Sequence, residues 1–108
     1  MSDTTFSMNA IREAFPEARY GSVKSAQYEA FRFLCRRVSK EMTMRRVRSI
    51  WEGAARRIDG EEKDALREAK IEEARREQRD IRQRLTKIDA FLASVDAGRD
   101  STSSAEIR

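Results

Sequence analysis

The sequence predicts an all-α protein in which a small N-terminal helical domain precedes a long C-terminal helix that forms a coiled coil. Apolar residues between positions 26 and 58 recur at helical spacing. No Pro or Gly interrupts the chain between Gly60 and Gly98. Within that stretch, five aliphatic residues follow one another at the alternating 4 and 3 spacing of a heptad seam: Ile81, Leu85, Ile88, Leu92 and Val95.

Composition limits the size of the core. The chain has 108 residues, of which 39% are hydrophobic, against roughly 45–50% in an ordinary globular domain. One small domain with an appendage fits this composition. No run of apolar residues approaches the ~20 needed for a membrane span, and the first residues lack the basic-then-apolar order of a secretory signal. We therefore expect a cytoplasmic protein without a membrane partner, associated with the nucleoid if it binds DNA.

The residue inventory argues against an enzyme. The single cysteine, Cys35, allows no intrachain disulfide, and the absence of histidine removes the usual zinc sites and His-dependent acid–base chemistry. We find no Gly-rich phosphate loop and no nucleophile beside a base. Acidic clusters such as Glu61-Glu62 lie among lysines and arginines, which favours ion pairing over metal binding. We expect no catalytic residue, metal site or cofactor.

Positive charge is concentrated in one segment. Residues 32–58 contain nine basic and two acidic side chains, a local balance of +7, whereas the whole chain carries +4. Eight of these nine basic residues are arginine, whose planar guanidinium suits phosphates and guanine edges. The segment therefore predicts a polyanion partner. The alternative is that the arginines only solvate helix faces.

The first 21 residues contain short elements. Residues 1–8 are small and polar apart from Phe6 and predict a loose arm. A short helix is expected from Asn9 to Ala14, ended by the residue before Pro16. A turn is expected at Tyr20-Gly21.

The next helix is expected to begin at a cap supplied by Ser22 or Ser25 and to run to about Ser39. Phe33 lies off its apolar face and either packs on the first segment or is exposed. Because Cys35 lies on that face, we expect a buried structural thiol. The predicted core positions are Ala26, Ala30, Phe31, Leu34, Cys35, Val38 and Met42.

A second, arginine-rich helix is expected from Met44 to about Ile58, capped by Thr43 after a turn at residues 39–42. Gly53 marks either a close helix approach or an early end of this helix. Trp51 is expected to anchor the core. One side of the helix is formed by Val47, Ile50, Trp51, Ala54 and Ile58, and the exposed side by Arg45, Arg48, Glu52 and Arg56.

The sequence from Thr43 to Trp51 resembles the second helix of helix-turn-helix DNA-binding regulators of the small bacterial or phage type: a capping hydroxyl, outward polar positions, then an aliphatic pair three residues apart. The resemblance covers about 20 residues with the preceding helix and implies that the start of the second helix enters the major groove while its inner face packs on the first. It implies a helix-turn-helix-like domain at residues 1–58. The predicted DNA-binding residues are Arg36, Arg37, Lys40, Thr43, Arg45, Arg46, Arg48 and Ser49. The alternative is an arginine-rich helix packed in a helical bundle.

The third part of the chain begins with a capping-box spacing, Asp59 and Glu62, and continues as a helix to Val95. We assign residues 59–96 to a long dimerisation helix in which Ile81, Leu85, Ile88, Leu92 and Val95 join two copies. Two alternatives are that this seam folds back on its own domain or docks the helix of a different protein. Residues 97–108 lack an apolar period and predict a disordered tail.

These patterns together predict a homodimeric, sequence-specific double-stranded DNA-binding transcriptional regulator. The alternative is a protein-binding inhibitor or adaptor that docks an acidic partner surface through the basic face and the long helix. RNA binding through the arginine-rich helix is a third hypothesis.

Overall fold

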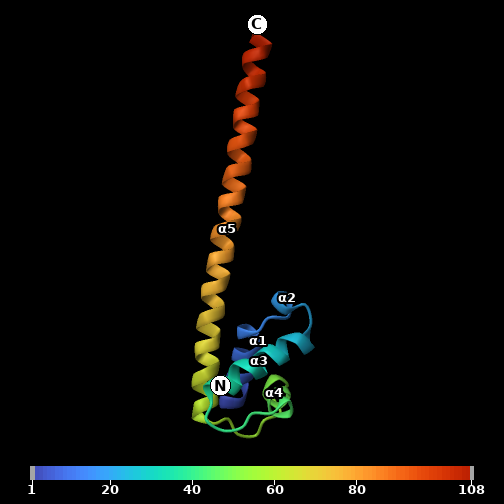
Figure 1. The fold of residues 1–108 in the computed structure, drawn as a ribbon, viewed down its shortest axis with the longest axis vertical. Coiled ribbons are helices and arrows are strands. Elements are labelled where there is room, and N and C mark those ends of the chain that lie inside the picture. The colour runs from blue at the N-terminus through green and yellow to red at the C-terminus, as the bar shows by residue number, and fades with distance from the viewer. Residues whose placement is uncertain (1, 108) are drawn as a thin grey trace. The chain divides into compact units, whose positions relative to one another are not determined.

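The computed structural model describes the backbone of residues 2–107 and the side chains of residues 2–99. The all-α prediction is confirmed: α1 spans Asp3–Ala14, α2 Glu17–Tyr20, α3 Val23–Arg37, α4 Met44–Trp51 and α5 Gly60–Ile107 (Figure 1), and residues 2–107 contain no strand. The chain divides into two compact units, Met1–Arg75 and Arg76–Arg108. Helix α5 begins in the first unit and continues through the second.

Helix α1 starts earlier than the sequence predicted. The Ser2 side chain caps it by accepting a hydrogen bond from the Thr5 backbone N–H at 3.2 Å, so residues 3–8 are helical and not a loose arm. Thr4 Oγ1 donates to the Ala55 carbonyl at 2.9 Å, and Ser7 is fully buried. These contacts fix the segment to the fold. A small polar residue followed by an acidic one is itself a capping signal, which the prediction overlooked.

The connections around α2 follow the sequence closely. Helix α1 ends at Ala14, just before the Phe15-Pro16 pair, and Gly21 takes the left-handed conformation with φ of 88° that closes α2. Ser22 then caps α3 by accepting a hydrogen bond from the Ser25 backbone N–H at 3.0 Å. Of the two predicted caps, Ser22 is the one used.

One core joins α1, α3, α4 and the first turns of α5, which lie side by side in Figure 1. Phe33, for which the sequence left two possibilities, is buried and packs edge-on against Phe15 with ring centroids 5.9 Å apart. Phe31 and Ile58 are partly buried against the core. The predicted core positions that are buried are Ala26, Ala30, Leu34, Val38, Met42, Val47, Ile50 and Trp51.

Two predicted core residues are exposed. Cys35 lies on the solvent side of α3 and is not a buried thiol. The buried side of this helix is centred on Ala26, Ala30 and Phe33, and position 35 is rotated away from it. Ala54 is exposed because α4 has already ended.

Helix α4 ends at Trp51, seven residues before the predicted end. Gly53 has φ of 71°, a left-handed conformation that terminates the helix, and the Ser49 carbonyl accepts the following backbone N–H of Ala54 at 2.9 Å. A Cβ at Gly53 would lie 2.8 Å from the Met8 sulfur. Both interpretations of this glycine therefore hold: it ends the helix and admits a close neighbour.

Helix α5 starts as the capping-box spacing predicted. The Asp59 backbone N–H donates to Glu62 Oε1 at 3.0 Å, and the Asp59 carbonyl accepts from the Lys63 N–H. Ala65, Leu66 and Ala69 bury this part of the helix in the core. The first turns of α5 thus belong to the N-terminal domain.

The second unit is helical throughout its described backbone. The helix runs to Ile107, so the backbone of residues 97–107 is not the irregular tail expected from composition; no proline interrupts this stretch. The side chains of residues 100–108 lie outside the described set. Within the described residues, we find no helix with the length and apolarity to cross a membrane.

Candidate nucleic-acid interface

Helix α4 has a buried side and an exposed side, which follow from the rotation between successive residues of the helix. Thr43 caps it by accepting a hydrogen bond from the Arg46 backbone N–H at 3.1 Å. Val47 and Ile50 are fully buried, and the rotation of about 100° per residue turns Arg45 and Arg48 toward solvent, where both are exposed. In the described part of the chain, neither arginine makes an ion pair or side-chain hydrogen bond.

Arg46, predicted to face DNA, is half-buried and paired within the domain. Its guanidinium binds Glu62 through two hydrogen bonds, Nε to Oε2 at 2.9 Å and Nη2 to Oε1 at 2.7 Å. Nη2 also donates to the Arg57 carbonyl at 2.6 Å. This two-point pair joins α4 to the start of α5, so the guanidinium of Arg46 already has an acidic partner within the domain.

Lys40 and Arg37 also form ion pairs with acidic side chains in α5 or just before it. Lys40 forms ion pairs with Asp59 and with Glu62, the latter at 3.2 Å. Arg37 pairs with Glu68 and, at 3.2 Å, with Glu72, and its guanidinium lies 4.8 Å from the centre of the Phe33 ring. The charges of both residues are therefore balanced by acidic side chains of the same domain.

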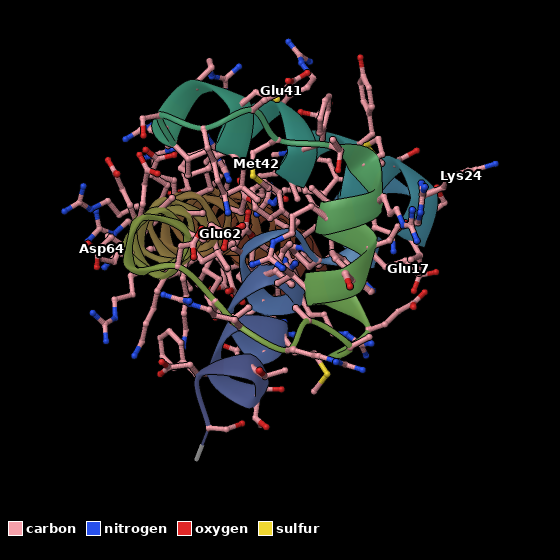
Figure 2. The ribbon with its side chains drawn as sticks, turned by 90° about the horizontal axis from the view of Figure 1, so that it is seen from below. Glu17, Lys24, Glu41, Met42, Glu62 and Asp64 are labelled. Carbon is pink, nitrogen blue, oxygen red and sulfur yellow. The ribbon has the colours of Figure 1, made fainter. Side chains whose placement is uncertain are left out.

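Glu62 is the centre of this network. Figure 2 shows it turned toward the interior of the fold, whereas Asp64 points outward from the same helix. Its side chain is fully buried. Burial raises the pKa of Glu62, but hydrogen bonds from Arg46, the Asp59 backbone and Lys40 outweigh that effect and leave the pKa below its usual value. Glu62 is therefore an ionised carboxylate in the folded domain.

The other predicted DNA-binding residues differ in whether their side chains are exposed and free of partners within the chain. Arg36 is exposed, with no ion pair or side-chain hydrogen bond among the described residues. Thr43 is exposed and its hydroxyl serves as the α4 cap, while Ser49 is half-buried beneath the turn that follows α4. The exposed cationic set from the prediction is thus Arg36, Arg45 and Arg48.

A groove between α3 and α4, which we call the α3–α4 groove, adds two residues that the sequence analysis missed. Lys24 and Tyr28 line it together with Met44 and Arg48. Lys24 is exposed and extends away from the fold in Figure 2, and Tyr28 is 53% exposed. The Ser22 cap could have directed attention to these positions.

The five seam residues lie in the second unit and are all exposed in the single chain: Ile81, Leu85, Ile88, Leu92 and Val95. Their exposed fractions run from 37% for Val95 to 56% for Leu85. An uncovered apolar row of this length is typical of an interaction surface.

No protein-family model matches the chain, and neither a curated protein nor a solved structure matches it.

Proposed function

We propose that the N-terminal domain binds double-stranded DNA through the outward face of α4 and that the protein acts as a small transcriptional regulator. The observation that carries the proposal is the availability of Arg45 and Arg48. Both are exposed on a capped helix and neither has an acidic partner among the described side chains, while the adjacent Arg46 is paired. Two free guanidinium groups one turn apart suit guanine edges in a major groove.

Two further exposed cations, Lys24 and Arg36, would hold the domain on the phosphate backbone. Lys24 at the start of α3 lines the same groove as Arg48, and Arg36 lies near the end of α3. Contacts of this kind fix orientation and contribute affinity without reading sequence. In this proposal Arg45 and Arg48 select the site, and Lys24 and Arg36 add general affinity.

Self-association completes the proposal. A single short recognition helix reads few base pairs, and helix-turn-helix proteins commonly bind two half-sites as a symmetric pair. The exposed seam of α5 offers the surface for a second copy, which makes the proposed DNA-binding form a homodimer.

A fluorescence-polarisation titration with random duplex DNA over a salt series tests binding. The four cations that this proposal assigns to DNA, Lys24, Arg36, Arg45 and Arg48, predict a slope of log affinity against log salt of about −4 per chain. No affinity at low salt would overturn the proposal and favour a protein-binding adaptor. Stronger binding to structured RNA in competition would favour RNA as the target.

Arginine variants test the assignment of roles. Arg45→Ala or Arg48→Ala is expected to relax base preference in a selected site at a cost of about 1–3 kcal/mol. Arg36→Ala is expected to weaken binding to all duplexes equally and to reduce the salt slope. Arg75→Ala is the matched control, because it removes an exposed arginine from α5, away from the α3–α4 groove. Equal effects of Arg45→Ala and Arg75→Ala would contradict the groove assignment.

A further inference from the structure

The seam of α5 has a heptad register that distinguishes its two kinds of core position. The step from Ile81 to Leu85 is four residues and the step from Leu85 to Ile88 is three, which places Leu at the a positions and Ile at the d positions. Leu92 and Val95 continue the same order. Two-stranded coiled coils favour the reverse, β-branched residues at a and Leu at d, whereas Leu at a with Ile at d favours assemblies of more strands.

A further apolar residue widens the seam. Phe91 occupies a g position beside Leu92 and is 64% exposed. A two-stranded coil leaves much of such a ring in water, because only the a and d positions are enclosed. Helices in a four-helix bundle bury a broader face that includes e or g positions. The width of the seam and the order of its core residues therefore indicate the same kind of assembly.

Parallel strands pair the charged residues beside the seam more completely than antiparallel strands do. In a parallel, in-register assembly each g position lies near the e position five residues later on a neighbouring copy. Glu77 then meets Arg82 of the neighbouring copy, and Arg84 meets Asp89, so that both contacts join opposite charges. Among the described residues, these four side chains form no ion pair within their own chain.

Gln78 occupies the a position that precedes Leu85, and this polar residue also favours parallel strands. Gln78 would meet the same residue of neighbouring copies in a parallel assembly, where amides can bond to one another. An antiparallel alignment that overlaps the whole seam, with Leu85 opposite Ile88, places Gln78 against Val95 instead. That contact leaves a polar amide against an aliphatic side chain.

We infer that the seam joins four copies of this chain as a parallel, in-register coiled coil, and that the proposed DNA-binding pairs occur two to an assembly. The inference rests on the self-association proposed above and is independent of DNA binding. Because α5 is already fixed in the first unit by Ala65, Leu66 and Ala69, the seam does not have to nucleate its own helix.

Sedimentation equilibrium of the full chain tests the number of strands. Four chains of 12.5 kDa give a particle of about 50 kDa, and two give about 25 kDa. A second comparison uses a variant that exchanges core residues without changing composition, Ile81→Leu, Leu85→Ile, Ile88→Leu and Leu92→Ile. This exchange places Ile at a and Leu at d and is expected to convert the tetramer to a dimer. Far-ultraviolet circular dichroism verifies that the variant remains helical.

The outcomes separate this inference from the proposed function. A mass of about 25 kDa for the natural chain overturns the tetramer and leaves the DNA-binding dimer intact. A monomer at micromolar concentration overturns both forms of self-association. A tetramer for both the natural chain and the exchanged variant contradicts the role assigned to Leu85 and Ile88, because composition alone would then suffice.

Charge reversal tests the orientation. Arg84→Glu is expected to weaken the assembly by placing two acidic side chains together, and Arg84→Glu combined with Asp89→Arg is expected to restore it in the parallel arrangement. In the antiparallel arrangement described above, Asp89 lies near Arg82 of the other copy, so the double variant would remain weak. Failure of the double variant to restore the natural mass overturns the parallel register.

Discussion

Replacing Glu62 by Gln tests whether the buried ion pair holds the N-terminal domain together. The substitution keeps the shape of the side chain and an oxygen able to accept from the Asp59 N–H, but it removes the charge that faces Arg46 and Lys40. The new amide also brings N–H donors toward the guanidinium, which has only donors to offer. The variant therefore leaves the cation of Arg46 without its counter-charge.

The expected cost follows from the burial of the two partners. Breaking a buried pair by removing one member costs about 3–5 kcal/mol. Glu62 is fully buried, but the Arg46 side chain is 27% exposed and can regain some water, so the lower end, about 3 kcal/mol, is expected. That is a large part of the stability of a small domain, typically about 5–15 kcal/mol in total.

Trp51 provides the assay, because it is the single tryptophan and is 7% exposed in the core of the first unit. Its fluorescence in urea reports unfolding of this unit, and the midpoint is expected to fall by about 1–3 M with an unchanged slope. Asp64→Asn is the matched control: it removes an acidic charge two residues away at an exposed site and is expected to cost less than about 0.5 kcal/mol. A Glu62→Gln midpoint equal to that of Asp64→Asn would refute the role given to the network.

Three further results follow from individual contacts. The folded-state pKa of Glu62 lies below its ordinary value of 4.5, so its ionised form stabilises the fold fully above about pH 4.5 and loses this effect as pH falls through the folded-state pKa. The urea midpoint of the natural chain should therefore fall in acid, and the midpoint of Glu62→Gln should fall less steeply. Gly53→Ala forces a side chain into the left-handed conformation against Met8 and should cost about 1–2 kcal/mol by Trp51 fluorescence. Cys35, exposed on α3, should react with a thiol reagent in native buffer as completely as in denaturant; protection in native buffer would contradict its placement.

Local signals in the sequence predicted the starts of α3, α4 and α5. Ser22 and Thr43 cap α3 and α4 as expected, and Asp59 with Glu62 marks the start of α5. These features depend on residues three positions apart, so sequence alone contains them. The start of α1 was missed although Ser2 supplies a cap of the same kind, because the polar composition of the first residues outweighed it.

Long-range pairing could not be predicted in the same way. The partner of Arg46 lies 16 residues away, and those of Arg37 lie 31 and 35 residues away. Charge counting placed both arginines on a binding surface, whereas in the fold both form ion pairs with glutamates of α5. The prediction that Cys35 is buried failed for a related reason, since the buried side of α3 is decided by where α2 and α4 lie and not by hydrophobicity alone.

Two of the three arginine doublets in the basic segment divide their charge between the fold and the surface. Arg36 and Arg37 are neighbours in α3, and Arg45 and Arg46 are neighbours in α4. Each step along a helix turns the side chain by about 100°, so the second arginine of each pair reaches carboxylates of α5 while the first remains in solvent. The domain consequently neutralises about half of the charge that the sequence concentrates there. Of the unpaired arginines, Arg36 and Arg45 lie on helices, so that the positions from which their side chains extend are fixed.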